Sequence, residues 1–273
     1  MRAKMRMPFT RLIPTLIALV AVALPASAIT WGQPDTTEHP NVGAMVVGFG
    51  GPAIYQWCSG TLIHPQVFLT AGHCTVDLFQ SGVTDVFVNF DQNAFNRDTL
   101  RRVEQVVTHP NYYWGPTSNP HDVGVLILTD PTDIAPANLP YQGFLNDRLD
   151  EGELRQGSTR AKFTMVGYGN TILFPPPEFQ FFGQREYSVS EYRALLKSWL
   201  RMSQNQATGD GGTCYGDSGG PAFWTEPDGT ETLVGVTSWG DQPCVASAFN
   251  YRVDTADTLD FIADVIEWLQ PIP

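Results

Sequence analysis

The apolar residues of this chain come in short runs divided by Gly, Pro, Asn and Asp, and this pattern limits the fold more than any other feature of the sequence. Short runs between turn-forming residues are typical of β-strands, whereas helices need longer stretches with a helical period. The runs fall at 43–48, 60–69, 83–90, 123–128, 161–168, 221–224, 231–239 and 249–253. We therefore expect an all-β protein built as a barrel or a sandwich.

Two segments have apolar residues at helical spacing instead. We expect 190–202 to be a helix in an insertion that covers the second half of the fold. We also expect a helix over 258–269, with Asp257 as its N-cap and Pro271 as its stop. The apolar residues of that helix would share one face: Leu259, Ile262, Ile266 and Leu269. The Phe- and Pro-rich segment 172–182 is interpreted as a packed surface loop rather than a wall of a substrate groove.

The first 28 residues differ from the rest. Basic residues come first, an apolar run from Leu12 to Leu24 follows, and Pro25-Ala26-Ser27-Ala28 ends the segment. This order predicts a secretory signal peptide, residues 1–28, cleaved after Ala28. An uncleaved membrane anchor is the alternative, but about thirteen apolar residues interrupted by Pro14 are short for a bilayer. We expect an exported protein, secreted or periplasmic, whose mature chain begins at Ile29.

The composition supports a folded and acidic protein. With 42% hydrophobic and 16% charged residues, a chain of 273 residues can bury a substantial core. The formal net charge is −12, and cleavage after Ala28 removes four basic and no acidic residues, which leaves −16. This balance argues against nucleic acid or an anionic membrane as a partner.

A serine stands among glycines in Thr213-Cys214-Tyr215-Gly216-Asp217-Ser218-Gly219-Gly220-Pro221. A serine hydroxyl is a poor nucleophile unless an imidazole takes its proton, and a carboxylate then holds that imidazole in the useful tautomer. His73, in Ala71-Gly72-His73-Cys74, offers the base, and Asp122, after His121, offers the carboxylate. Each motif alone has an ordinary reading as a turn or a strand end. Together they predict a catalytic serine.

Two other classes of hydrolase fit the sequence less well. The residues around Ser218 match the G-x-S-x-G motif of α/β-hydrolases, but in that fold the histidine follows the serine. All five histidines precede Ser218, which excludes this order. The subtilisin order needs a carboxylate before His73, such as Asp35, and no motif supports one there.

With these motifs in the order His73, Asp122 and Ser218, spaced 49 and 96 residues apart, the sequence resembles the trypsin/chymotrypsin-like serine endopeptidases. The resemblance implies two six-stranded antiparallel β-barrels, at about 29–140 and 141–256, and a C-terminal helix at about 257–269. It assigns His73 as base and acid, Asp122 as the residue that orients it, and Ser218 as nucleophile.

The resemblance also implies an oxyanion hole and an activation step. The oxyanion hole would consist of the backbone N–H groups of Gly216 and Ser218. The α-ammonium of Ile29, freed by export, would form an ion pair with Asp217 and so complete the site.

Four cysteines in an exported chain predict two disulfides, for which the sequence alone leaves three pairings open. Metal binding is the weaker alternative, because no C-x₂-C pair occurs. The resemblance selects Cys58–Cys74 and Cys214–Cys244. Each would stabilise the fold by about 3–4 kcal/mol in the chain-entropy model.

The resemblance places the substrate pocket around Gly212, Thr213, Ser238, Trp239, Gly240 and Ala248. Gly212 stands where an aspartate would select Lys or Arg, so we expect cleavage after apolar or aromatic residues rather than basic ones. The loop at 226–228 could still supply a carboxylate.

The remaining expectations concern partners and the other histidines. Polypeptide substrates and protein protease inhibitors are the partners that the resemblance implies, for a monomer without cofactor or metal. The alternative is an inactive homologue that serves as a secreted binding module, but such homologues lose a catalytic residue and this chain keeps all three. His39, His64 and His109 each adjoin a proline and are interpreted as turn residues, and His121 as a neighbour of the site rather than a base.

Overall fold

The computed structural model describes residues 29–76, 78, 80–115, 117–173, 178–181 and 183–269. The predicted signal peptide, Pro271 and part of the segment 172–182 lie outside the described residues. Among the described residues, the structure contains no helix long and apolar enough to span a membrane.

Six antiparallel strands close the first barrel in the order β2-β3-β4-β7-β6-β5. They are β2 (Val42–Gly48), β3 (Ile54–His64), β4 (Val67–Thr70), β5 (Asp85–Asn89), β6 (Arg101–Thr108) and β7 (Gly124–Leu128). Every residue of β2, β4 and β7 is buried, as expected for strands that line a barrel core. Phe68 fills this core so tightly that a Cβ on Gly60 would lie 2.4 Å from its ring, so only glycine fits there.

Six further strands form the second barrel. They are β8 (Lys162–Gly167), β11 (Glu186–Leu195), β12 (Trp199–Ser203), β13 (Pro221–Thr225), β14 (Glu231–Gly240) and β15 (Ser247–Arg252). The sheet order is β1-β11-β12-β15-β14-β13-β8, and pairing of β11 with β8 closes it. The short strand β1 (Gln33–Pro34) joins β11 from outside the barrel. The two-barrel, all-β fold expected from the sequence is thereby confirmed.

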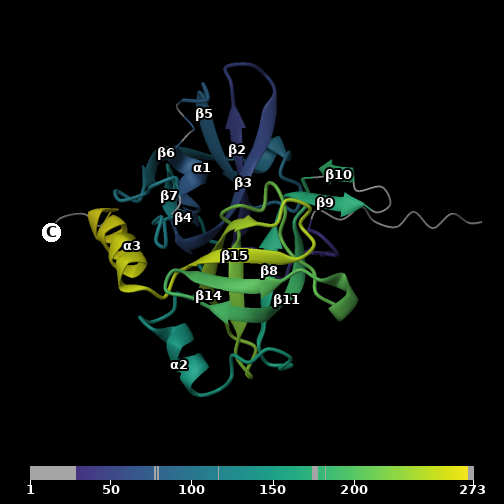
Figure 1. Ribbon diagram of the computed structural model, residues 1–273. Coiled ribbons are helices and arrows are strands. Elements are labelled where there is room, and N and C mark those ends of the chain that lie inside the picture. Colours follow the sequence, from purple (N-terminus) through teal and green to yellow (C-terminus); the bar gives the residue numbers. More distant parts are fainter. Residues whose placement is uncertain are drawn as a thin grey trace, which may run out of the picture.

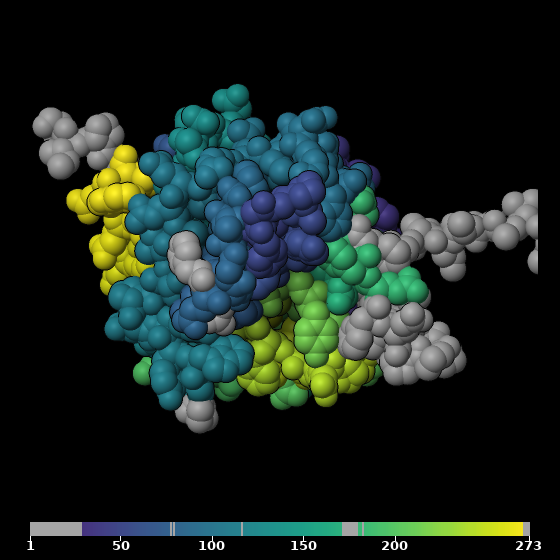
Figure 2. All heavy atoms as spheres, turned by 90° about the horizontal axis from the view of Figure 1, so that it is seen from above, coloured from purple at the N-terminus to yellow at the C-terminus, as the bar shows by residue number. Residues whose placement is uncertain are grey.

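The barrels pack against each other, with the purple-to-blue one above the teal-to-yellow one in Figure 1. Helix α3 (Ala256–Leu269) follows the second barrel but returns to the first, where Phe261, Ile262 and Val265 join the core cluster of its strands. Seen from above, the first barrel covers much of the second and α3 lies along its side (Figure 2).

The remaining elements are short. They are α1 (Gly72–Val76), α2 (Phe144–Asp150), η1 (Arg97–Thr99), η2 (Gln206–Thr208) and a hairpin of β9 (Asn170–Leu173) with β10 (Glu178–Phe181). Helix α2 lies in the connection between the two barrels.

The predicted helix at 190–202 is wrong. Its residues form the end of β11 and the whole of β12, which pair as a hairpin through Tyr192↔Met202 and Leu195↔Leu200. Their apolar spacing fits a strand as well as a helix, and pairing with β8 and β15 gives their backbone groups partners on both sides. The sequence fits the period of a strand and the period of a helix equally well, and strand pairing in the folded protein selects the strands.

Two smaller expectations also change. The run 60–69 is a β3–β4 hairpin rather than one strand, because the chain turns between His64 and Val67.

The C-terminal helix is present, but Asp257 is inside its first turn. Thr255 Oγ1 accepts from the Thr258 N–H at 3.3 Å in the position of a cap. Asp257 binds histidines instead, as described below.

Candidate active site

Neighbouring strand ends bring His73 and Asp122 together. Strand β4 pairs with β7 through Thr70↔Gly124, so helix α1, which follows β4, begins beside the residues that precede β7. The backbone N–H of His73 donates to Asp122 Oδ1 at 2.8 Å, and the ring Nδ1 lies 3.0 Å from Oδ2. Backbone and side chain of His73 are therefore fixed by the same carboxylate.

Asp122 is well suited to hold the imidazole in one tautomer. Its side chain is nearly fully buried, which acts to raise its pKa, but the adjacent His73 ring, Ser238 Oγ and the His73 N–H more than offset burial and lower the pKa. An ionised Asp122 only accepts hydrogen bonds, so Nδ1 of His73 carries the proton and Nε2 is left as the base. Ser238 reaches Asp122 because β14 bulges between Thr237 and Trp239.

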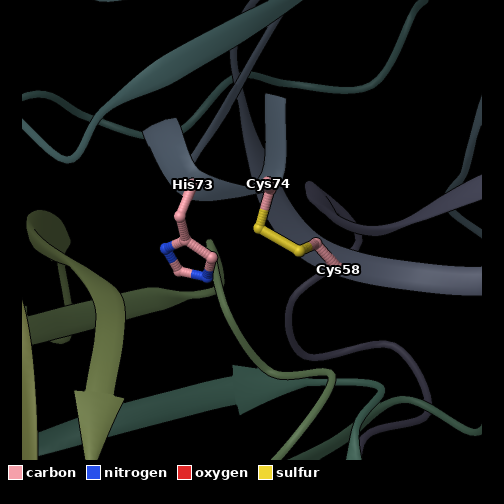
Figure 3. A group of neighbouring side chains, drawn as sticks. All are labelled: Cys58, His73 and Cys74. Atoms are coloured by element: carbon pink, nitrogen blue, oxygen red, sulfur yellow. A yellow bond between two sulfur atoms is a disulfide. The ribbon is translucent and has the colours of Figure 1, made fainter. Parts of the chain in front are cut away.

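His73 stands beside a disulfide. Its ring extends from α1 toward the second barrel, next to the Cys58–Cys74 bond (Figure 3). The three side chains come close enough to suggest a metal site, but both sulfurs are in a disulfide and offer no thiolate. The second disulfide joins Cys214 to Cys244 and links the two walls of the pocket described next.

Hydrogen bonds to two carbonyl groups hold the backbone around Ser218. Tyr215 O accepts from the Asn170 N–H at 2.7 Å, and Asp217 O accepts from the Gly220 N–H at 2.8 Å. In a trans peptide the N–H points opposite to the carbonyl, so the N–H groups of Gly216 and Ser218 are oriented by these bonds. Gly216 has φ +96°, a conformation that favours glycine.

The first barrel also holds this loop. Gly216 O accepts from Gln56 Nε2 at 2.7 Å and from Ser59 Oγ at 3.0 Å, and the Ser59 N–H donates to Ser218 O at 2.8 Å. The sequence did not indicate Gln56, Ser59 or Asn170, because each acts through the backbone of a distant segment.

His73 and Ser218 line one hollow of about 330 Å³ between the barrels. Its other walls are residues from three segments: Trp114, Thr213, Cys214, Tyr215, Thr237, Ser238, Trp239, Gly240, Asp241 and Cys244. Most of the predicted pocket residues are thus gathered at one place. The carboxylate of Asp241 is occupied by three backbone N–H groups, those of Val245, Ala246 and Ser247.

Gln204 is fully buried behind Thr213, a residue that lines this hollow. A Cβ on the buried Gly212 would lie 2.3 Å from both Cγ and Nε2 of Gln204, and that Nε2 donates to Thr213 O. The Gln204 amide therefore takes the space that a side chain at 212 would need. Ala248 is buried and pairs with Gly240 and with Met202. No signal in the sequence singled out Gln204, which follows β12.

The loop at 226–228 supplies no carboxylate to the hollow. Glu226 binds Arg148 of α2 at 2.9 Å, and Asp228 accepts from the Thr230 N–H within the β13–β14 turn. Among the described residues that line the hollow, Asp241 supplies the one carboxylate, and its oxygens accept from backbone N–H groups.

Two further hollows flank the site and suit an extended ligand. One, of about 380 Å³, is lined by aromatic rings beside Asp122 and Ser238: Tyr112, Tyr113, Trp114, Trp199 and Trp239. The other, of about 360 Å³, adjoins Gly216 and includes Gln56, Trp57, Phe95, Phe181 and Tyr215. Trp114 is 76% exposed, and its ring centre lies 6.2 Å from that of His73.

The Ile29 nitrogen contacts Glu186 in this structure, and the ion pair of a freed Ile29 with Asp217 stays a prediction. The Ile29 N–H donates to Glu186 Oε2 at 3.0 Å, while Asp217 accepts from the N–H groups of Gly169 at 2.7 Å and Cys214 at 2.8 Å. Ala28 precedes Ile29 in this sequence, so the nitrogen is a peptide N–H rather than the free ammonium of the expectation.

A second cluster with metal-like composition adjoins Asp122. Oδ2 of Asp257 lies 2.7 Å from His121 Nδ1 and 3.5 Å from His109 Nε2. The other ring nitrogens face donors, the Asn111 N–H and Asn119 Nδ2, so the nitrogens that face Asp257 carry the hydrogens. A metal-bound imidazole has the opposite arrangement, with its far N–H donated to an acceptor. This cluster instead ties α3 to the segment before Asp122.

The fold and the site together define a double β-barrel protein in which a histidine from one barrel and a serine from the other line the same hollow. Comparison with known proteins gives the particular family. The family model described as Trypsin matches residues 29–262, and the chain belongs to this family of serine proteases.

Proteins similar to this chain come from several different organisms. The chain is 27% identical over 272 residues to lectizyme of Glossina austeni, covering 92% of this chain and 91% of that protein. It is 30% identical over 229 residues to tryptase of Mus musculus, with 73% and 77% covered. It is 29% identical over 213 residues to trypsin of Saccharopolyspora erythraea, with 76% and 84% covered.

Among solved structures, HL collagenase superposes with a TM-score of 0.66 at 18% identity, over 88% of this chain and 99% of that one. At that identity the likeness shows the shared fold alone.

Proposed function

We propose that this protein is an exported serine endopeptidase in which Ser218 is the nucleophile, His73 the base and acid, and Asp122 the residue that orients His73. The observation that carries the proposal is the pair of hydrogen bonds from His73 to Asp122 at the edge of the hollow that Ser218 lines.

The reaction follows from the orientation of these groups. His73 Nε2 takes the proton of Ser218 as its Oγ attacks the carbonyl carbon, and the oxyanion accepts hydrogen bonds from the Gly216 and Ser218 N–H groups. The imidazolium is stabilised by Asp122 and gives its proton to the leaving amine as the C–N bond breaks. Water then repeats the sequence on the acyl-enzyme and releases the acid.

The preferred residue before the scissile bond is apolar or aromatic rather than basic. Gly212 and the Gln204 amide leave the base of the pocket without a charge, and Asp241 is already bound to three N–H groups. A buried cation would find no carboxylate at Gly212 and only the already hydrogen-bonded Asp241 nearby, so its desolvation would be poorly compensated. The aromatic hollow beside Trp239 supports an extended polypeptide substrate.

Cleavage of the signal peptide during export would produce the mature chain. The basic, apolar and small-residue order of residues 1–28 supports cleavage after Ala28, which would place a free ammonium at Ile29. The buried position of Ile29 and the backbone pairing of Thr30 with Gly212, at 3.0 Å in both directions, support a role for this end in building the pocket.

A digest of a denatured protein mixture by the mature chain tests the proposal. We expect new peptide ends after Phe, Tyr, Leu or Met, and none after Lys or Arg above background. Ser218→Ala should abolish these ends while leaving the circular dichroism unchanged. If Ser218→Ala cleaves as well as the parent, the nucleophile is wrong; if the parent cleaves nothing, the chain is a binding module.

A further inference from the structure

A buried pair of carboxyl groups lies next to the first residue of the proposed mature chain. Glu186 of β11 pairs directly with Gly167 of β8, so side chains at these two positions would share one face of the sheet. A Cβ on Gly167 would lie 2.2 Å from Asp217 Oδ1, which shows that Asp217 fills the space of that missing side chain. Glu186 and Asp217, 2% and 0% exposed, are therefore neighbours inside the protein.

The chain delivers Ile29 to this pair. Its nitrogen donates to Glu186 Oε2 at 3.0 Å, and its side chain is fully buried. Thr30 is bonded to Gly212 in both directions, and the Gly32 N–H donates to Ile29 O at 2.8 Å. A Cβ on Gly32 would lie 2.8 Å from Glu186 Oε2, so the segment folds closely around this carboxyl group.

The two carboxyl groups influence each other's ionisation. Burial and, to a smaller extent, the charge of Glu186 raise the pKa of Asp217 to about 8, against the hydrogen bonds from Cys214 and Gly169. Two adjacent buried carboxyl groups resist ionising together unless a cation joins them. Cleavage before Ile29 would convert the nitrogen that now touches Glu186 into an ammonium, which is such a cation.

We propose that Glu186 and Asp217 together bind the α-ammonium of Ile29, with Glu186 making the direct contact. The proposal rests on the proposed function, which includes cleavage after Ala28. It departs from a simple pair between Ile29 and Asp217, because the ammonium is held between β11 and the loop that carries Ser218. Loss of Glu186 should therefore loosen the N-terminus and lower the fraction of chains with a formed oxyanion hole.

The test compares chains released from a fusion so that Ile29 is the first residue, with and without Glu186→Gln. Protection of the α-amine is read from its rate of reductive methylation by formaldehyde and cyanoborohydride, followed by mass spectrometry. We expect Glu186→Gln to speed methylation of the α-amine at least about tenfold and to lower kcat/KM by on the order of 10- to 100-fold. Both effects should be smaller in a chain that keeps Ala28.

Glu191→Gln is the matched control, because Glu191 is also a buried carboxyl group of β11 but contacts the Gly157 N–H. It should leave methylation and kcat/KM unchanged. If Glu186→Gln keeps the α-amine protected and the enzyme fully active, the proposal is wrong while the proposed function stands. If the chain that keeps Ala28 is as active as the chain that begins at Ile29, activation by cleavage is itself wrong.

Discussion

At the scale of single residues, buried charges with specific partners carry most of the chemistry. Asp122 remains ionised inside the protein because His73 and Ser238 compensate its burial, and this ionised state fixes the tautomer of His73. The sequence predicted His73, Asp122 and Ser218 because their motifs are local. It did not indicate Glu186, which meets Ile29 across 157 residues, because a single glutamate in a strand has no distinguishing pattern.

Asp122→Asn should lower kcat by on the order of 10⁴, the loss that the same change causes in a related protease. The amide can donate to Nδ1, which would place the proton on Nε2 and remove the base. KM should change far less, since Asp122 does not line the hollow that contains Ser218. Steady-state kinetics on one peptide substrate measure this, with Asp228→Asn, on an exposed turn, as the control. A loss below about tenfold would refute the role of Asp122.

His39 makes the stability of the folded protein depend on pH. Burial alone would lower its pKa, but hydrogen bonds to Asp35 and Glu231 raise the pKa to about 9. The unfolded pKa is about 6.5, so this stabilisation is complete below pH 6.5 and is lost as the pH rises through 9. It amounts to roughly 3 kcal/mol.

Urea unfolding between pH 6 and 10 measures this stabilisation. We expect His39→Gln to be less stable than the parent at pH 6 and to lose less stability over the same window. The matched control is His64→Gln, since the His64 ring accepts a hydrogen bond from the Gln66 N–H. Parallel stability curves for the parent and His39→Gln would contradict the assignment.

At the scale of elements, strand pairing decides where the sequence pattern is ambiguous. The apolar residues of β11 and β12 fit a helix equally well, and only the closure of the second barrel selects the strands. Strand β6 was not foreseen, because of its eight residues only Val103 is buried and the others give no apolar run. The contact between Gln204, which follows β12, and Gly212 was not predicted either, because no local sequence pattern connects these two segments.

This packing predicts that Gly212→Asp alone does not create cleavage after Lys or Arg. The new Cβ would collide with Gln204, and such overpacking costs about 1–3 kcal/mol of stability. Gly212→Asp combined with Gln204→Gly should accommodate the carboxylate and raise kcat/KM for a Lys substrate on the order of 10- to 100-fold. Paired Lys and Phe peptides measure the change. Efficient Lys cleavage by the single variant would show that Gln204 does not fill this space.

At the scale of the whole molecule, two barrels that share no sequence repeat each supply part of one site. The first contributes His73, Asp122 and the contacts of Gln56 and Ser59, and the second contributes the loop of Ser218. This division was predicted from the sequence, because the three motifs resemble those of a family with two barrels. The contact of Ser238 with Asp122 and the positions of Gln204 and Glu186 could not be predicted, because they depend on strand registers set by the closed barrel rather than by neighbouring residues.

Covalent labelling of the mature protein with a fluorophosphonate tests most directly whether these residues meet in a working site. The account predicts one adduct per chain, on the peptide that contains Ser218, formed at least about 100-fold more slowly in His73→Ala. An unlabelled Ser218 in the folded chain that begins at Ile29, or labelling at the same rate in His73→Ala, would contradict it.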